Sequence, residues 1–332
     1  MSQIDDTGIY DIYIAARGSA ALAVGVRLGL FGWLDAGGRT EAEMAQHLSL
    51  APRGVASLCR ALVGLGLLQR NGAQLSLSAE AASVLVPGKH GYLGDLIDMD
   101  FDSWLSPERL LTAVRRGRPG VYGADDMWAA HEEDPERTAR FARMMTSISS
   151  RPAAALATTV DFSQSSHLLD VGGGSGIFTT TILTAHPHMR GTIYDLAQVQ
   201  GLAEEALSAA GIAARAEMVA GDMFGEAWPS GADVILLSQI LHDWTPQQCG
   251  QLLSRAFEAL PSGGRILIHE KLIEDDGGPR ANALADLDML YWTEGQQLSR
   301  LDAHQWLAAA GFVDTQIQAT VGYWSVVSAL RP

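Results

Sequence analysis

The stretch His167-Leu-Leu-Asp-Val-Gly-Gly-Gly-Ser-Gly176 joins a short apolar run to a cluster of glycines, and a segment of helix length follows it. Such a run predicts a buried strand that ends in a sharp turn before a helix. Glycines at this turn remove Cβ atoms where the chain bends and where a ligand approaches the backbone. Because ligands of open parallel sheets bind at the carboxyl ends of the strands, we predict a ligand site here.

The spacing of the glycines and a nearby acid indicate which ligand binds. The dinucleotide fingerprint is GxGxxG, in which a pyrophosphate rests on the helix N-terminus. Here the register is GxGxG, and Asp170 lies two residues before Gly172. A carboxylate at this place repels pyrophosphate and attracts a cationic aminoacyl sulfonium group. We therefore assign Asp170, Gly172 and Gly174 to S-adenosylmethionine rather than to NAD.

Short strand-like runs alternate with helix-length segments after residue 163, which predicts a doubly wound, Rossmann-like α/β fold for residues 156–332. Helices are expected at 202–210, 247–260 and 301–310. The two last runs, 312–319 and 323–330, are close enough to pair as an antiparallel edge. The expected strands before them are 167–171, 191–194, 216–219, 234–237 and 265–269.

Two further acids follow the second and third expected strands. Asp195 lies about 25 residues after Asp170, near the distance at which a carboxylate holds ribose hydroxyls in such folds. We expect Asp222 to bind the exocyclic amine of adenine, while Met223 stacks on the ring. A single acid at a strand end is commonly just solvated, but three acids at successive strand ends favour a shared ligand. The other expected cofactor residues are Leu196, Gly221, Phe224, Ser238 and Gln239.

The sequence pattern of residues 1–92 predicts a winged-helix-like unit. Thr40-Glu-Ala-Glu43 is a capping box that begins a helix, and Pro52–Leu68 forms a second, amphipathic one. Asn71-Gly72 lies between two short β-like runs as a hairpin turn. Residues 93–155 are helical and rich in large side chains, so we expect them to link the units and to wall an apolar pocket for a small ligand.

The composition narrows the partners of the 332-residue chain. A net charge of -15 disfavours nucleic acid and anionic membranes, because binding either needs clustered Lys and Arg. The expected helix Pro52–Leu68 offers only Arg53 and Arg60 for DNA. Cys59 and Cys249 form no metal or disulfide pattern, so we expect no metal and a reducing cytoplasm. The sequence shows no signal peptide and no uninterrupted apolar stretch of membrane-spanning length.

Five stretches and the winged-helix-like front resemble the class I small-molecule O-methyltransferases, close to the plant caffeate and flavonoid enzymes and their bacterial relatives in antibiotic and pigment tailoring. The most specific motifs are LLDVGGGSG and LHDW. The resemblance spans essentially the whole chain and implies S-adenosylmethionine as methyl donor, S-adenosylhomocysteine as product, and a front domain that forms a homodimer. The stretches are 167–176, 191–195, 221–224, 241–244 and 263–270.

Methyl transfer to a phenol calls for a base. A phenol has a pKa of about 10, so at pH 7 the phenolate is disfavoured by roughly 4 kcal/mol. His242, in the LHDW motif after the fourth strand, matches the general base of the family, and Glu270 matches one of its two acids. The second family acid follows a glycine turn, where this chain has Gln297. An amide accepts a hydrogen bond but does not balance an imidazolium charge. Glu294, at a position where the family usually has glycine, is an alternative source of a carboxylate. Asp243 is another alternative partner, although a residue adjacent to His242 usually points elsewhere.

Large apolar side chains complete the expected site. Thioethers and aromatic faces suit a flat acceptor through dispersion and sulfur–ring contacts. For each of these residues ordinary core packing is the competing interpretation. The expected substrate-binding residues are Met145, Met289, Trp292, Tyr291, Trp104 and Asp243.

Four functions remain open from the sequence. The leading hypothesis is O-methylation of a phenolic or enolic hydroxyl of a secondary metabolite. N- or C-methylation of a heteroaromatic ring does not always need a strong base, so it would be compatible with Gln297 in place of the family acid. Some family members keep the cofactor but catalyse hydroxylation, decarboxylation or pericyclic rearrangement, and His242 argues against this function. The absence of a basic patch argues against a DNA-binding regulator.

Overall fold

The computed structural model describes residues 5–102, 106–119 and 135–332. The chain divides into two compact units. One unit comprises Met1–Trp104 and Arg143–Ile148, and the other comprises Leu105–Ala142 and Ser149–Pro332. The three-part division at residues 92 and 155 stays a prediction.

In the first unit, local sequence signals begin and end the elements. The Thr40 hydroxyl accepts from the Glu43 amide at 3.2 Å and the Glu43 carboxylate accepts from the Thr40 amide at 2.7 Å, which forms the expected capping box. Gly72, with φ of 60°, makes the hairpin turn. The elements are α1 Thr7–Arg27, α2 Leu30–Asp35, β1 Arg39–Thr40, α3 Glu41–His47, α4 Pro52–Gly64, β2 Leu68–Asn71, β3 Gln74–Leu77, α5 Ala79–Val84, α6 Gly94–Asp98 and the 3₁₀ helix η1 Met99–Asp102.

The small sheet of this unit has the order β1-β3-β2 and is antiparallel. The apolar faces of α2 and α4 pack on it around Phe31, Leu62 and Leu75, which are almost completely buried. Helix α4 ends at Gly64, four residues before the expected end, because Gly66 adopts a positive φ of 74°.

Helix α1 is the one described helix that is long and apolar enough, by length and composition, to cross a membrane. Asp11 and Arg17 interrupt its sequence. Its first turns expose Ile9, Tyr10 and Ile12.

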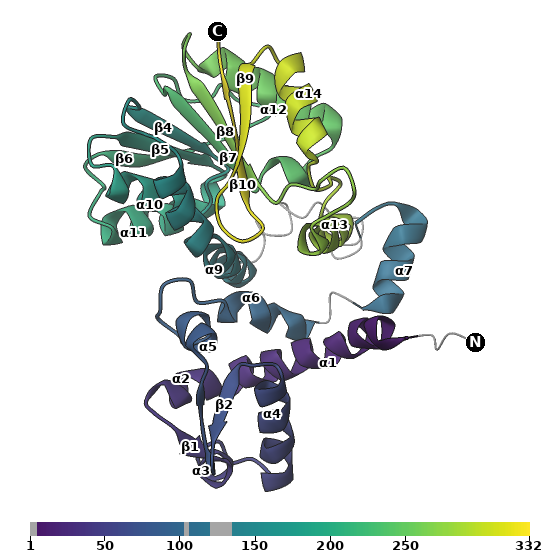
Figure 1. Cartoon of the computed structure of the whole chain (residues 1–332). Helices are drawn as coiled ribbons and strands as arrows, with labels where there is room; N and C mark the ends of the chain where they lie inside the picture. Colours follow the sequence, from purple (N-terminus) through teal and green to yellow (C-terminus); the bar gives the residue numbers. More distant parts are fainter. Residues whose placement is uncertain (1–4, 103–105, 120–134) are drawn as a thin grey trace. The chain divides into compact units, whose positions relative to one another are not determined.

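The second unit is built on a seven-stranded sheet of order β6-β5-β4-β7-β8-β10-β9 (Figure 1). The first five strands in this order are parallel, and β10 pairs antiparallel with both β8 and β9. The predicted Rossmann-like fold and the pairing of the last two runs are therefore confirmed, although β10 lies inside the sheet and only β9 is at its edge. The strands are β4 His167–Val171, β5 Arg190–Asp195, β6 Ala216–Ala220, β7 Val234–Ser238, β8 Arg265–Glu270, β9 Val313–Ala319 and β10 Ser325–Leu330.

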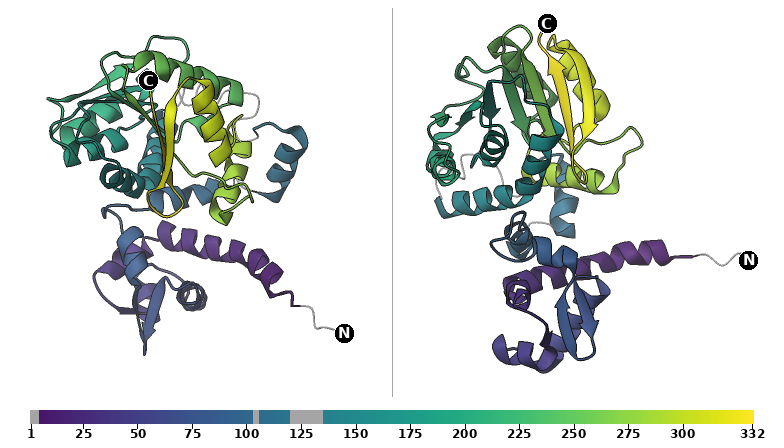
Figure 2. Two further views of the ribbon diagram at one scale, coloured as in Figure 1. Left: turned by 45° about the horizontal axis from the view of Figure 1, so that its top comes forward. Right: turned by 60° about the vertical axis from the view of Figure 1, so that its left-hand side comes forward.

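Helices cover both faces of this sheet (Figure 2). Successive residues of β7 alternate between two apolar clusters: Ile235 packs with α12 and α14, and Leu236 packs with α9, α10 and α11. Burial on both faces explains the continuous apolar run of this strand. The helices are α7 Pro107–Arg116, α9 Pro135–Thr159, α10 Ile177–Ala185, η2 Ala197–Val199, α11 Gln200–Ala209, η3 Leu241–Asp243, α12 Pro246–Ala259, α13 Arg280–Trp292 and α14 Arg300–Ala309, and α9 contributes to both units.

The order of the strands locates the ligand edge. Strand β4 lies between β5 and β7, so the chain moves outward in one direction from β4 to β6 and in the other from β7 to β8. Ligands of such sheets bind at the carboxyl ends of the strands at this switch point. The turn after β4 and the loop after β7 therefore meet at one edge.

Candidate active site

The glycine turn after β4 has the geometry that the sequence predicts. Gly172, Gly174 and Gly176 have φ angles of 70°, 55° and 78°. A Cβ atom on Gly172 would lie 2.2 Å from Cδ1 of Ile240, and one on Gly176 would lie 2.5 Å from Cδ1 of Ile193. A Cβ atom on Gly174 would meet no atom within 4 Å. The first and third glycines thus permit close packing, while the middle one borders open space.

Asp170 lies beneath this turn. It is buried, and its Oδ2 accepts a hydrogen bond from the Thr179 hydroxyl of α10 at 2.8 Å. Burial, with a smaller contribution from the charge of Asp195, raises the pKa of Asp170 to about 7. Among the described residues no cation pairs with it, so a cationic ligand would stabilise its charge.

Asp195, at the end of β5, ties the turn to the neighbouring strand. Its two carboxylate oxygens accept hydrogen bonds from the amides of Gly174 and Leu196, both at 2.7 Å. Burial raises the pKa of this carboxyl. Its carboxylate thus lies beside the open space at Gly174.

The turn after β6 lies next along the same edge. The Gly221 amide donates to the Asp195 carbonyl at 2.9 Å, and a Cβ atom on Gly221 would lie 2.5 Å from the Tyr194 ring. Asp222 is exposed, and its Oδ1 accepts from the Phe224 amide at 2.8 Å. Met223 and the Phe224 ring are partly buried against the core. The three predicted acids therefore come from three adjacent strand ends.

Ser238 is the last residue of β7, Gln239 follows it, and both are buried. The Ser238 hydroxyl lies 3.3 Å from Nδ1 of His269, and the Gln239 amide nitrogen donates to the Ser149 hydroxyl at 2.7 Å. Gln239 has a positive φ of 58°, which for a side chain with a Cβ atom stores strain and turns the chain toward His242. We retain both as proposed cofactor residues.

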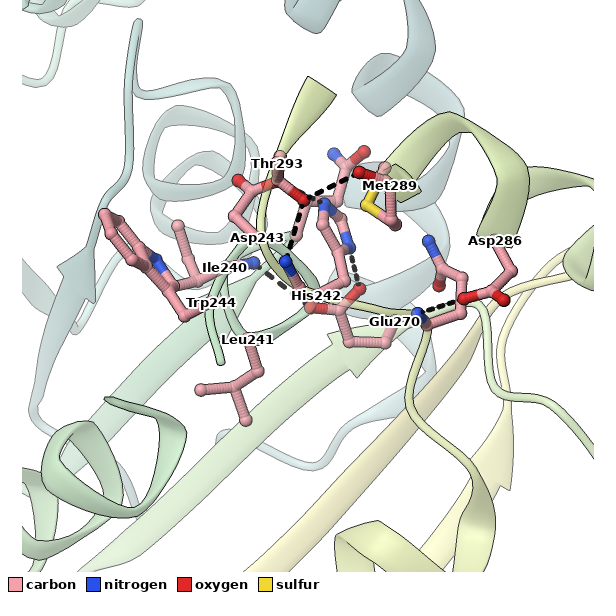
Figure 3. Close-up of polar contacts among 12 residues, drawn as sticks. Ile240, Leu241, His242, Asp243, Trp244, Glu270, Asp286, Met289 and Thr293 are labelled. Carbon is pink, nitrogen blue, oxygen red and sulfur yellow. Dashed lines mark hydrogen bonds and ion pairs between the residues drawn. The ribbon is translucent and has the colours of Figure 1, made fainter. Parts of the chain in front are cut away.

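His242 and Glu270 form the closest ion pair of the site (Figure 3). Nδ1 of His242 lies 2.6 Å from Oε2 of Glu270, and the other oxygen of Glu270 accepts from the Ile240 amide at 3.1 Å. Both side chains are buried. The carboxylate thus fixes the turn after β7 and favours the tautomer with hydrogen on Nδ1, which leaves Nε2 as the basic atom. Nε2 lies 3.5 Å from Oδ1 of Asp243.

The electrostatics of this cluster favour a bound proton. Burial by itself lowers the pKa of His242, but the charges of Glu270 and Asp243 and the hydrogen bond from Glu270 outweigh it and raise the pKa to about 9. Burial raises the pKa of Asp243 to about 6, although the His242 charge opposes this shift. The imidazole is therefore a stronger base than a histidine in water.

The loop after α13 packs directly against the His242 turn. A Cβ atom on Gly295 would lie 2.1 Å from the His242 carbonyl oxygen. The Gly295 amide donates to the Thr293 hydroxyl at 3.2 Å, and this hydroxyl donates to the Met289 carbonyl (Figure 3). Glycine is thus required by the close approach of two backbones.

Gln297 does not reach the base through a hydrogen bond. Its backbone amide donates to Oδ1 of Asp286 at 2.8 Å. The buried Oε1 of its side chain has no hydrogen-bond partner among the described residues. Within the described part of the chain, the imidazole of His242 is paired with Glu270 and Asp243 and not with Gln297. Its proposed catalytic role therefore has no direct contact to support it.

The expected substrate residues fall in several places. Met289 and Trp292 are partly buried on α13, and the buried Tyr291 donates from its hydroxyl to the Ser106 carbonyl at 2.8 Å. Met145 lies on the part of α9 that belongs to the first unit. Trp104 lies outside the described residues.

Several contributing residues were not predicted. Thr179 holds Asp170, and Ser149 holds Gln239 from a position 90 residues earlier in the chain. Lys271 follows Glu270, and its charge acts on His242. A hydroxyl on the helix after a glycine turn was a signal for Thr179, whereas nothing in the local pattern indicates Ser149.

Comparisons with known proteins identify the family. Residues 108–313 match an O-methyltransferase domain, and residues 12–87 match an O-methyltransferase dimerisation domain. The chain belongs to the S-adenosylmethionine-dependent O-methyltransferases. This result supports the leading hypothesis, an O-methyltransferase.

Individual relatives agree with this assignment. A 3-hydroxy-5-methyl-1-naphthoate 3-O-methyltransferase of Streptomyces sahachiroi is 37% identical over 295 residues, which cover 87% of this chain and 84% of that protein. The tetracenomycin polyketide synthesis 8-O-methyl transferase TcmO of Streptomyces glaucescens is 31% identical over 98% of this chain and 96% of its own. Human N-acetylserotonin methyltransferase in complex with SAM matches with a TM-score of 0.89 and 26% identity, over 100% of this chain and 99% of that one.

The cofactor of the enzyme is S-adenosylmethionine, and the residues at the sheet edge fit it. The space at Gly174 is open, Asp170 has no cation among its described partners, and Asp222 presents an exposed carboxylate beside an apolar Met223. In the described ranges no three His, Cys, Asp or Glu residues come close enough to hold a metal ion.

Proposed function

We propose that the enzyme methylates a hydroxyl group of a small aromatic acceptor and that His242 is the general base. The observation that carries this proposal is the buried pair of His242 Nδ1 and Glu270 Oε2 at 2.6 Å, placed at the sheet edge beside the glycine turn. The contact that a Cβ of Gly172 would make with Ile240 shows how closely the cofactor turn and the loop of the base adjoin.

The cofactor, His242 and Glu270 have separate roles in the proposed methyl transfer. Bound S-adenosylmethionine supplies an electrophilic methyl group on a sulfonium. Nε2 of His242 takes the proton of the acceptor hydroxyl, and Glu270 stabilises the imidazolium that forms. Because the pKa of His242 is raised to about 9, it lies close to that of a phenol, so the proton transfer is nearly balanced in free energy.

We assign the cofactor to the predicted residues at the strand ends. Asp195 would hold the ribose, Asp222 the adenine amine and Asp170 the cationic end of the ligand. The remaining proposed contacts come from the backbone and side chains beside these acids: Gly172, Gly174, Leu196, Gly221, Met223, Phe224, Ser238 and Gln239.

We also propose that the acceptor is a flat, fused aromatic ring bearing the hydroxyl. By their names, the two bacterial relatives act on a hydroxynaphthoate and in the synthesis of a polyketide. On this chain Met289 and Trp292 of α13 would contact such a ring, and Asp243 would contact the acceptor beside His242. Met145 and Trp104 stay predictions from the sequence.

We propose a cytoplasmic homodimer. The first unit carries the family's dimerisation domain, and α1 exposes the apolar side chains Ile9, Tyr10 and Ile12, which a second copy would cover. Both cysteines are buried and free, in keeping with a reducing compartment. The net charge of -15 disfavours nucleic acid as a partner.

The test uses labelled S-adenosylmethionine with a panel of hydroxynaphthoic acids, phenols and nitrogen heterocycles. We expect label on a hydroxyl oxygen, and His242→Ala should lower turnover by on the order of 10² while the Kd for the cofactor changes by less than a few-fold. The matched control is His304→Ala, an exposed histidine on α14. Label only on nitrogen or carbon, or unchanged turnover of His242→Ala, would contradict the proposal.

A further inference from the structure

Lys271 is the neighbour in sequence of Glu270, the proposed partner of the base, and has no role in the proposed mechanism. The chain contains two lysines, and Lys271 directly follows Glu270 at the end of β8. The other, Lys89, donates to Asp35 at 2.7 Å and to the Ala82 carbonyl at 3.0 Å. Lys271 makes no hydrogen bond or ion pair with any described residue, although it is partly buried.

An aromatic wall fixes the position of Lys271. Its Nζ lies 5.0 Å from the centroid of the Trp324 ring. Ser325 pairs with Glu270 between β10 and β8, so Trp324 stands across from Lys271 at the same end of the sheet. The Trp324 ring stacks on His269 with centroids 5.1 Å apart and is itself buried. The Nζ of Lys271 therefore lies over a buried ring that is itself packed on His269.

The charge of Lys271 is poorly compensated. Burial lowers its pKa, and the carboxylates of Asp288 and Glu270 only partly oppose this shift. Neither carboxylate is within ion-pair distance of Nζ, and Glu270 is already bound to His242 and to the Ile240 amide. A partly buried ammonium with three unmatched donors gains most from an anion that brings its own acceptor oxygens.

The lysine directly follows the residue that binds the proposed base. Glu270 ends β8, and its Oε2 lies 2.6 Å from Nδ1 of His242. Asp288, which acts on Lys271, precedes Met289 on α13, the helix proposed to contact the acceptor ring. A rigid aromatic acceptor with its hydroxyl at His242 would thus present a second substituent toward Lys271.

We propose that Lys271 is a specificity-determining residue that binds a carboxylate substituent of the acceptor, so that the preferred substrates are hydroxyarene carboxylic acids. The inference rests on the proposed O-methylation and narrows its substrate class. A lysine acts as a point charge, so it accepts carboxylates in several orientations and favours the ionised acid over neutral isosteres.

The experiment compares an acid with its neutral isostere. The kcat and KM of the full-length enzyme are measured for 3-hydroxy-1-naphthoic acid and for its carboxamide, with the wild type, Lys271→Met and Lys271→Arg. We expect the wild type to prefer the acid at least tenfold in kcat/KM. Lys271→Met should reduce this preference tenfold or more, mainly through KM for the acid, and Lys271→Arg should restore most of it. Lys89→Met is the matched control and should keep the wild-type preference.

Binding measurements separate this proposal from the proposed function. Calorimetry in the presence of S-adenosylhomocysteine gives the Kd of the acid and the amide without turnover, and thermal unfolding shows whether each variant folds. If no hydroxyl is methylated but Lys271→Met still weakens binding of the acid selectively, the proposed function fails and the subsite stands. If the wild type does not discriminate, or Lys271→Met weakens acid and amide equally, the lysine serves the fold and the subsite is refuted.

Discussion

Replacing Glu270 by glutamine tests the source of the basicity of His242. Glutamine keeps the shape of the side chain and an oxygen for the Ile240 amide, but it removes the charge that opposes the effect of burial on the imidazole. In the native cluster the pKa of His242 is raised from 6.5 to about 9. Without the Glu270 charge, burial dominates and Asp243, at 3.5 Å, offsets it only in part, so we expect a pKa of His242 at or below its ordinary value.

The expected loss of turnover follows from the difference between the pKa of the base and the pKa of the acceptor hydroxyl. The difference between the pKa of a phenol, about 10, and the pKa of His242 grows from about one unit to more than three. Each pKa unit is worth about 1.4 kcal/mol. At pH 9 and above, where half or more of the wild-type imidazole is neutral, a barrier increase of about 3 kcal/mol corresponds to a loss of on the order of 10² in turnover. Near pH 7 the loss is smaller, because most of the wild-type His242 is protonated there.

The pH profile distinguishes this cause from a structural one. The neutral imidazole is the active form, so kcat/KM of the wild type should rise with pH up to about 9, as His242 loses its proton. In Glu270→Gln the rise should end near pH 6.5, leaving a low, flat profile from pH 7 to 9. Turnover and cofactor Kd are measured across pH 6 to 10, with Glu274→Gln as control because Glu274 pairs with Arg300 at the surface. A Glu270→Gln enzyme with wild-type turnover at pH 9, or with the wild-type midpoint, would refute the reasoning.

Three further predictions concern the turns around the site. Gly295→Ala should lower kcat by about 10²-fold with little change in cofactor Kd, because its Cβ would displace the His242 backbone; calorimetry and kinetics check this, and an unchanged kcat argues against it. Asp195→Ala should raise the cofactor Kd at least about tenfold by calorimetry, since it also holds the Gly174 amide; an unaffected Kd discredits the ribose assignment. Because burial raises the pKa of Asp170 to about 7, the folded state binds its proton more tightly than the unfolded state, and this carboxyl makes the protein less stable as pH rises from about 4 to 7. Asp170→Asn should therefore gain up to about 4 kcal/mol in free energy of unfolding relative to the wild type between pH 4 and 8, and a difference that does not vary with pH would contradict this.

Local patterns in the sequence determined the architecture of the second unit. The alternation of apolar runs with helix-length segments predicts each parallel strand, because burial on both faces imposes a continuous apolar run. The GxGxG turn with Asp170 identifies the cofactor, since glycine spacing and charge are properties of a short segment. The position of His242 after β7 follows in the same way from strand order and motif.

Only the tertiary structure decided which side chains act together. The contact of Gln239 with Ser149 joins residues 90 positions apart, and Gly295 meets the His242 carbonyl across a loop, so no periodicity in the sequence signals either. The place of β10 inside the sheet depends on its pairing with β8, which lies far away in sequence. Gln297 follows the family spacing but bonds to Asp286 through its backbone.

The same distinction applies to the two charged neighbours at the end of β8. Glu270 was predicted from the family motif, whereas Lys271 belongs to no motif. We assign it a role only because its Nζ lies over the Trp324 ring and has no hydrogen-bond acceptor among the described residues. The sequence determines which groups exist and which strands carry them. Packing determines which charges are left without partners, because desolvation and hydrogen bonding depend on atoms that are distant along the chain.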